Sequence, residues 1–201
     1  DDLFEMEVKQ TLLHGWSKQH KIDDIALEVN GLKFAQNKTF MDVIVVLAPA
    51  FLEHALATAN KATGGGASAE DLGKAFKAEL AKFLPKQVGL FRKFMHSDDD
   101  QEELIFGFGG FFLSSRPGCG GGGVLPGGTF QAMLKLLYDA DVVSEEVIIQ
   151  WSKDAAEDQA SLVNECSKMI QWCVTTPSFP FLPFLHHRIP AFSQHTPHRI
   201  V

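Results

Sequence analysis

Carboxylates gather at one point of the sequence, where Asp98, Asp99 and Asp100 are followed by Glu102 and Glu103. Paired carboxylates can serve as general acid and base, so this run is the first candidate for catalytic chemistry. Acids at the start of a helix are also stabilised by the helix dipole, and that structural role is favoured here. Neither the G-x-S-x-G motif of serine hydrolases nor the H-E-x-x-H motif of zinc proteases occurs. Enzymatic chemistry therefore has little support.

A zinc site is the second candidate, because histidines and cysteines gather toward the carboxy-terminal end of the sequence. Their spacing matches no standard set of zinc ligands, and a disordered tail is the favoured interpretation. We therefore expect no metal. The residues considered are Cys166, Cys173, His186, His187, His195 and His198.

A glycine-rich loop that binds phosphate is the third candidate. Residues 107–128 hold ten of the seventeen glycines. A P-loop needs a lysine and a serine or threonine directly after its last glycine, whereas Val124 follows Gly123 and Thr129 follows Gly128. Glycine inside a helix costs about 1 kcal/mol relative to alanine, so residues 107–128 are predicted to be non-helical and disordered. We expect no nucleotide or other cofactor.

Acidic residues dominate the charge of the chain, which has 201 residues and a formal net charge of −7. This balance argues against nucleic acid as a partner. Residues 139–165 hold eight acids and one lysine, whereas residues 173–201 hold no acid and two arginines. Such an acidic block is usually a solvated face, but it can also form one side of an interface with a lysine-rich partner.

Two further features bear on the cellular compartment. The longest apolar run, residues 43–52, is about half of what a bilayer-spanning helix needs, so no membrane segment is predicted. Three cysteines without a C-x-x-C pair suggest a reducing compartment, and we expect a cytoplasmic protein.

Helical periodicity runs through almost the whole chain. Val8, Leu12 and Trp16 lie four residues apart, and similar apolar stripes recur as far as Cys173, with no convincing period-two strand. Eight or nine helices with short loops predict an all-α fold of antiparallel helical hairpins, stacked as in degenerate solenoids. Pro49 is expected to kink one of these helices, and Pro85 to break another.

The predicted organisation is one domain over residues 1–172, interrupted by the glycine-rich loop 107–128. Residues 173–201 form a Pro- and His-rich tail that is predicted to be disordered. Trp151 and Trp172 both lie on apolar stripes, so burial is expected for both. Ser144, followed by two glutamates, is expected to cap a helix.

Two segments resemble a known family. The segment LLYDADVVSEEVIIQW, residues 136–151, resembles the first acidic-aromatic box of the HEAT-like carboxy-terminal domain of certain translation initiation factors. That domain occurs in the epsilon subunit of initiation factor 2B, in initiation factor 5 and in a regulatory mimic of factor 5. The segment LEVNGLKFAQN, residues 27–37, resembles the signature that opens the exchange domain of the epsilon subunit. The likeness covers residues 3–106 and 129–172.

The resemblance implies guanine nucleotide exchange on initiation factor 2, without covalent chemistry. It assigns the central role in exchange to Glu28, with Leu27 beside it in a similar role. The GTPase, which is the gamma subunit of factor 2, would be the direct partner. Other subunits of factor 2B would be reached through amino-terminal domains that this sequence does not contain.

The acidic-aromatic boxes imply a second contact, with lysine-rich blocks on the beta subunit of factor 2. The resemblance places Trp151 in the first box and Trp172 in the second. In the family a cluster of glutamates follows the second tryptophan, whereas no acid follows Trp172 here. The residues expected to bind this partner are Tyr138, Asp139, Asp141, Glu145, Glu146, Trp151 and Trp172.

Two alternatives remain beside the exchange domain. One is a non-catalytic adaptor of the factor 5 type, which binds the same lysine-rich blocks. The other is an unrelated helical scaffold whose acidic face only provides solvation. The signature at residues 27–37 favours the exchange domain over the adaptor.

Overall fold

The computed structural model describes residues 3–64, 67–114, 125–155 and 159–175. All regular elements in these ranges are helices, which confirms the predicted all-α class. The nine helices are α1 (Leu3–Lys18), α2 (Ile22–Ala35), α3 (Phe40–Ala62), α4 (Ala69–Phe94), α5 (Asp98–Ser114), α6 (Thr129–Asp139), α7 (Glu145–Asp154), α8 (Ala160–Glu165) and α9 (Ser167–Thr175).

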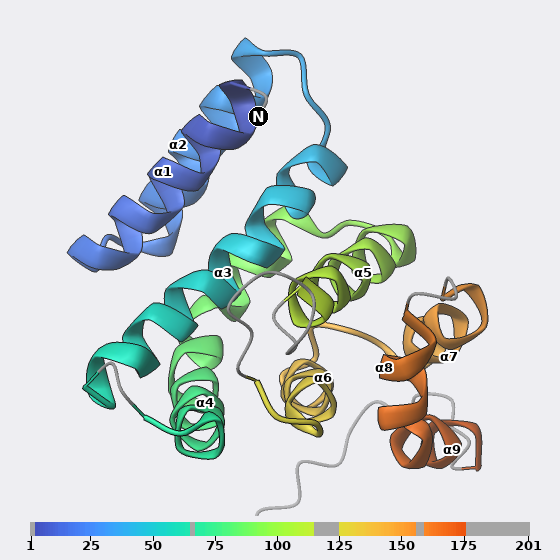
Figure 1. Cartoon of the computed structure of the whole chain (residues 1–201). Helices are drawn as coiled ribbons and strands as arrows, with labels where there is room; N and C mark the ends of the chain where they lie inside the picture. Colours follow the sequence, from blue (N-terminus) through green and yellow to red (C-terminus); the bar gives the residue numbers. More distant parts are fainter. Residues whose placement is uncertain (1–2, 65–66, 115–124, 156–158, 176–201) are drawn as a thin grey trace, which may run out of the picture.

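The helices form two layers that follow the order of the chain (Figure 1). In one layer α1, α3, α5, α7 and α9 contact one another in sequence. In the other layer α2 contacts α4, α4 contacts α6, and α6 contacts α8. This alternation is the packing of a HEAT-like stack, as predicted, and it places α2 and α9 at opposite ends of the molecule.

Side-chain caps mark where several helices begin. Thr39 and Asp42 form a reciprocal capping box at the start of α3. Ser144 Oγ accepts from the Val147 N–H at the start of α7, as predicted. The carboxylate of Asp100 accepts from the backbone N–H groups of His96 and Ser97 ahead of α5. The acidic run at 98–100 therefore lies in a first helical turn, where the structural interpretation placed it.

The core centres on α3, which packs against α1, α4 and α5. The Phe51 ring stacks on Phe83 with centroids 4.9 Å apart and meets Phe91 edge-on at 5.3 Å. Trp16 packs beside them, and its indole Nε1–H donates to Gln87 Oε1 at 3.0 Å. The buried indole thus has a polar partner as well as aromatic neighbours.

Helix α3 is also long and apolar enough, by length and composition alone, to cross a membrane. Its 23 residues exceed the run of ten that the sequence suggested. Half of its most apolar window is buried inside the molecule, between the neighbouring helices. A core helix passes the same test, and the position of α3 accounts for its hydropathy.

The prediction that Pro85 breaks a helix is wrong. Pro49 and Pro85 lie inside α3 and α4, and both helices continue past them. Proline removes one N–H donor and strains the preceding turn, but packing on both sides keeps each helix going. Phe83, Leu84 and Leu90 are buried around Pro85, and Leu47, Phe51 and Leu52 around Pro49.

The prediction that residues 107–128 are non-helical is wrong for its first part. Helix α5 runs through Gly107, Gly109 and Gly110 to Ser114. A Cβ on Gly107 would lie 3.0 Å from Ala48 Cβ, and one on Gly109 would lie 2.6 Å from Gln159 Oε1. Gly107 and Gly109 let α5 approach its neighbours closely, which outweighs their low helix propensity. Residues 115–124 lie outside the described part of the chain.

The predicted boundary at residue 172 also moves, because α9 continues to Thr175. Cys173 is buried, so the domain includes the first residues assigned to the tail. The remaining tail, residues 176–201 with its four histidines, lies outside the described ranges. Within those ranges, no group of three or more His, Cys, Asp or Glu side chains is placed to hold a metal ion.

Candidate protein-interaction site

An aromatic pair marks the surface where α6 meets α9. The rings of Tyr138 and Trp172 lie edge-to-face, with centroids 5.5 Å apart. Trp172 is 45% exposed, so the burial expected for it is wrong. The pair borders a groove of about 460 Å³ that is also lined by Gln131, Lys135, Asp139, Lys168 and Met169. An aromatic floor with polar edges is suited to a partner's long side chain.

The paired glutamates of the sequence motif lie close to this aromatic pair. Glu145 and Glu146 occupy the first turn of α7, where they favour the helix dipole. Burial raises the pKa of Tyr138, and the negative charge of Glu145 raises that pKa further. The pKa of Cys173 on α9 is raised by burial and then by the charge of Glu145. The structure therefore brings the acids of α7 to the junction of α6 and α9.

Two aspartates complete the acidic side of this surface, and both have basic neighbours. The Lys135 ammonium donates to the carboxylate of Asp139 at 2.6 and 2.8 Å. Arg92 lies 3.6 Å from the carboxylate of Asp141 and donates to the Ala140 carbonyl. Asp141 has a positive φ of 57° and a side chain that is 98% exposed. Exposed pairs of this kind are weak, so a partner's lysines can compete for these carboxylates.

Trp151, on the inner face of α7, lies in the core and not at this surface. Its side chain has no exposed surface, as its apolar stripe predicts, and it packs 5.6 Å from the Phe130 ring. The indole Nε1–H donates to Gln159 Oε1, and Gln159 in turn donates to the Phe106 carbonyl. Trp151 thus holds α7 against the core, and its side chain is not exposed at the surface of this structure. Gln159 is a supporting residue that the sequence motif did not indicate.

The two residues assigned to exchange lie at the other end of the stack, on α2. Leu27 is 73% exposed and Glu28 is also exposed, because the opposite face of α2 buries Ile25, Ala26 and Val29. The structure thus does not bring the residues of α2 together with those of α6, α7 and α9. It separates two candidate surfaces at the two ends of one solenoid (Figure 1).

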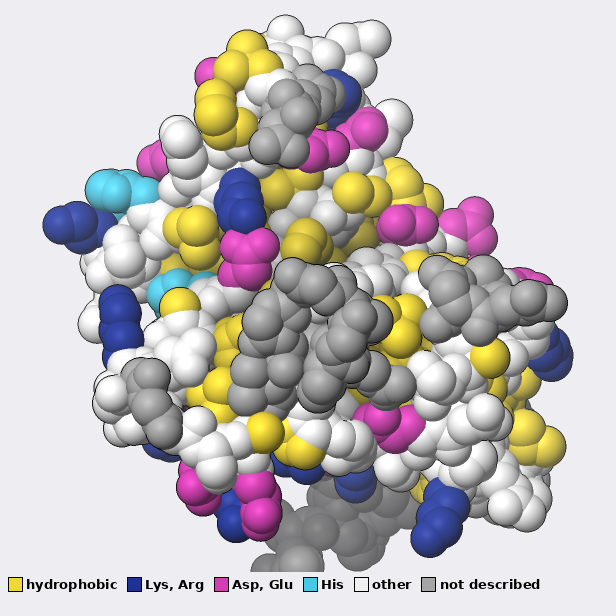
Figure 2. All heavy atoms as spheres, in the orientation of Figure 1, with side chains coloured by type: hydrophobic (Ala, Val, Ile, Leu, Met, Phe, Trp, Pro, Cys, Tyr) yellow, Lys and Arg dark blue, Asp and Glu magenta, His cyan; other side chains and the backbone are white. Residues whose placement is uncertain are grey.

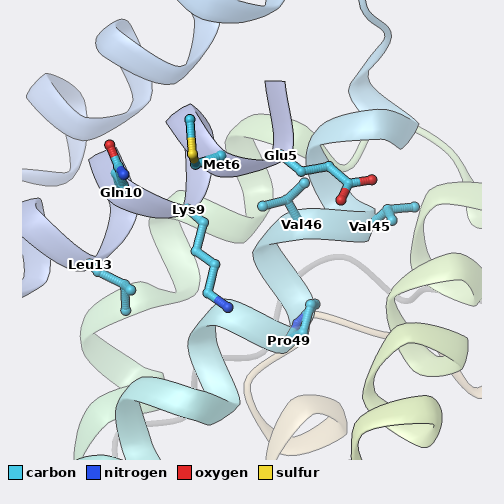
Figure 3. Close-up of a pocket in the computed structure, with 8 residues that line it drawn as sticks. All are labelled: Glu5, Met6, Lys9, Gln10, Leu13, Val45, Val46 and Pro49. Carbon is cyan, nitrogen blue, oxygen red and sulfur yellow. The ribbon is translucent and has the colours of Figure 1, made fainter. Parts of the chain in front are cut away.

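A further groove lies between α1 and α3, and the sequence did not indicate it. Its volume is about 390 Å³, and Met6, Leu13, Val45 and Pro49 supply much of its wall (Figure 3). Hydrophobic side chains lie along this boundary at the surface (Figure 2). The Lys9 ammonium forms an ion pair with Glu53 at 2.7 Å. None of the predicted site residues lines this groove.

Comparison with known proteins finds two similarities to translation initiation factors. Residues 100–175 match the W2 family, described as eIF4-gamma/eIF5/eIF2-epsilon. The chain is 28% identical over 172 residues to translation initiation factor eIF2B subunit epsilon of Dictyostelium discoideum. That match covers 84% of this chain and 22% of the relative, so the chain spans about a fifth of that protein's length. Residues 100–175 are therefore similar to the W2 domain of the family that includes eIF5 and the epsilon subunit, and most of the chain is similar to the epsilon subunit of the translation initiation factor eIF2B.

Proposed function

We propose that the chain promotes release of GDP from translation initiation factor 2. The observation that carries this proposal is the similarity to the epsilon subunit of eIF2B over 84% of the chain. On α2 the residues assigned to exchange, Leu27 and Glu28, stand exposed to a partner. A surface that binds the nucleotide-depleted GTPase more tightly than the GDP-bound form accelerates release.

The proposed exchange needs neither covalent chemistry nor a cofactor. A carboxylate such as that of Glu28 can compete for groups of the GTPase that otherwise hold the phosphates or their magnesium ion. Leu27 adds apolar contact directly beside that charge. The partner on this surface is the gamma subunit of factor 2, which is the GTPase.

The surface at α6, α7 and α9, the acidic-aromatic surface, has a second role in the proposal. It holds lysine-rich segments of the beta subunit. Trp172 and Tyr138 supply aromatic contact, while Glu145 and Glu146 supply negative charge. Asp139 and Asp141 add two carboxylates whose present basic partners are exposed. The acidic block steers basic segments toward the domain and aromatic contacts retain them. Trp151 supports this surface from the core.

The second candidate function is a non-catalytic adaptor of the initiation factor 5 type. The match to a family that includes eIF5 favours it, as does the position of the acidic-aromatic surface far from α2. Such an adaptor would bind the same lysine-rich segments in the cytoplasm without releasing nucleotide. Contacts with other subunits of factor 2B would use parts of the protein beyond this chain.

The deciding experiment measures release of labelled GDP from purified factor 2 in the presence of the wild-type chain, Glu28→Ala or Glu70→Ala. Glu70 is the matched control, because it is an exposed glutamate on α4, away from both surfaces. We expect acceleration by the wild type and the control, and none by Glu28→Ala. The unfolding free energy of Glu28→Ala should differ from that of the wild type by no more than about 0.5 kcal/mol.

Two results would separate the candidates. Binding of the beta subunit without any acceleration by the wild type would support the adaptor. Normal exchange by Glu28→Ala would remove that residue from the proposed mechanism while leaving exchange itself in place.

A further inference from the structure

The outer face of α2 carries the two most exposed large hydrophobic residues of the described chain. Leu27 and Phe34 are each 73% exposed. Gly31 lies between them, one helical turn from each, and nothing lies within 4 Å of the position that its Cβ would occupy. Bare backbone therefore separates two apolar side chains on one face of the helix, an arrangement called the notch.

The aromatic wall of this notch is held in place from below. The Lys33 ammonium lies 3.8 Å from the centroid of the Phe34 ring and 4.1 Å from that of Phe40. Lys33 is 5% exposed, so these cation–π contacts form away from bulk water, where they are strongest. The contact with Lys33 therefore favours one orientation of the exposed Phe34 ring. An aromatic side chain fixed in this way loses little entropy when a partner packs on it.

The exposed charged residues of α2 are acidic. Of the four charged residues of α2, Lys33 is buried and Asp23 is paired with Lys93 at 2.9 Å. Asp24 and Glu28 remain on the exposed face, one turn apart. A complementary surface therefore presents an apolar side chain next to a lysine or arginine.

We propose that Leu27, Gly31 and Phe34 form a notch that receives one aliphatic side chain of the GTPase, beside a basic residue that pairs with Glu28. This inference rests on the proposed exchange function and adds two residues, Gly31 and Phe34, that set how the partner docks. They are positioning residues, because they hold the partner so that Glu28 reaches the nucleotide site. Filling the notch should therefore weaken binding.

The experiment measures equilibrium binding of the isolated gamma subunit, because that subunit lacks the lysine-rich segments of the beta subunit. Gly31→Leu fills the notch, and Phe34→Ala removes its wall. Gly110→Leu is the matched control, since Gly110 is also an exposed helical glycine with nothing near its Cβ position. Thermal unfolding should show that both glycine variants remain folded, because leucine has the higher helix propensity.

We expect Gly31→Leu and Phe34→Ala to bind at least about tenfold more weakly than the wild type, and Gly110→Leu to bind as the wild type does. Wild-type affinity in both notch variants would overturn the notch, as would a wild-type chain that does not bind the gamma subunit. If the notch variants bind normally while Glu28→Ala has lost exchange, the notch fails and the exchange proposal stands. If they bind weakly while Glu28→Ala exchanges normally, the notch stands and the role of Glu28 fails.

Discussion

The indole of Trp172 meets the ring of Tyr138 edge-on, with their planes at 85°. This contact joins the end of α6 to α9 at the surface, and Trp172 keeps almost half of its area exposed. The other tryptophan of the sequence motif, Trp151, has no exposed area and is hydrogen-bonded within the core. One tryptophan is therefore available to a partner, while the other supports the surface from inside.

We predict that alanine at Trp172 mainly weakens peptide binding, whereas alanine at Trp151 mainly lowers stability. Trp172→Ala should reduce affinity for a lysine-rich peptide severalfold and lower the unfolding free energy by only about 1 kcal/mol, through loss of the contact with Tyr138. Trp151→Ala should lower the unfolding free energy by about 3–5 kcal/mol, because it leaves a large cavity in the core. Denaturant unfolding and peptide titration measure the two effects separately.

Trp151→Phe provides the control, since it keeps most of the buried volume and loses the hydrogen bond to Gln159 Oε1. Its peptide affinity should stay near that of the wild type. Strong loss of affinity in a folded Trp151→Phe variant would show that Trp151 reaches the partner after all, through a conformation unlike the present one.

The sequence predicts the helices well, because each apolar stripe has a matching buried face. Phe76 and Leu80 recur at helical spacing and both lie in the core. Their spacing is a local property that does not depend on the neighbours. The same local reasoning wrongly predicted that Gly107 lies outside a helix and that Pro85 breaks one. What decides those two positions is contact with residues distant in sequence, such as Ala48 against Gly107.

The candidate site was only partly predictable for the same reason. The motif at residues 136–151 identified the acids and Tyr138, and α6, α7 and α9 do bring several of them together with Trp172. Periodicity could not distinguish the exposed Trp172 from the buried Trp151, because both stand on apolar stripes. The notch at Gly31 was also hidden, since an exposed glycine leaves no periodic signal.

A second prediction concerns the proline inside α4. Alanine at position 85 would restore the N–H group that can donate to the Ala81 carbonyl. Because Pro85 is exposed, Pro85→Ala costs no buried surface. The free energy gained from this hydrogen bond and from relief of the strain should exceed the stabilisation that proline provides by restricting the unfolded chain, which is about 0.4–1 kcal/mol. We expect the unfolding free energy to rise by about 1–2 kcal/mol. Pro49→Ala should gain less, because Pro49 packs in the groove between α1 and α3; equal or reversed gains in thermal unfolding would contradict this.

A third prediction concerns pH. His54 lies 5.4 Å from the Trp16 ring and 4.9 Å from the Phe83 ring, and burial there lowers its pKa below the usual 6.5. The folded state therefore favours the neutral imidazole. Its contribution to stability is present above about pH 6.5 and is lost as the pH falls, because the unfolded chain takes up the proton first.

The variant that tests this is His54→Phe, which keeps an aromatic ring in place and cannot be protonated. Between pH 7.5 and pH 5.5 its melting temperature should fall less than that of the wild type. His20→Gln, at an exposed position, should follow the wild-type curve. Parallel curves for wild type and His54→Phe would show that His54 does not contribute to the pH dependence.

The last prediction concerns the charge of the acidic-aromatic surface. Reversing Glu145 and Glu146 to lysine places two positive charges beside Tyr138, so affinity for a lysine-rich peptide should fall tenfold or more at low salt. The loss should shrink at high salt, because exposed charges are screened beyond about 8 Å at physiological ionic strength.

The matched control reverses Glu70 and Glu79 on α4, which changes the net charge equally at another place on the surface. If peptide binding depends on local complementarity, this control keeps most of its affinity. If both pairs weaken binding equally, only the net charge matters and the surface has no specific role. The first turn of α7 also loses favourable contact with the helix dipole in Glu145→Lys and Glu146→Lys, at about 0.3–1 kcal/mol each. Unfolding measured alongside the titration separates this loss of stability from the loss of binding.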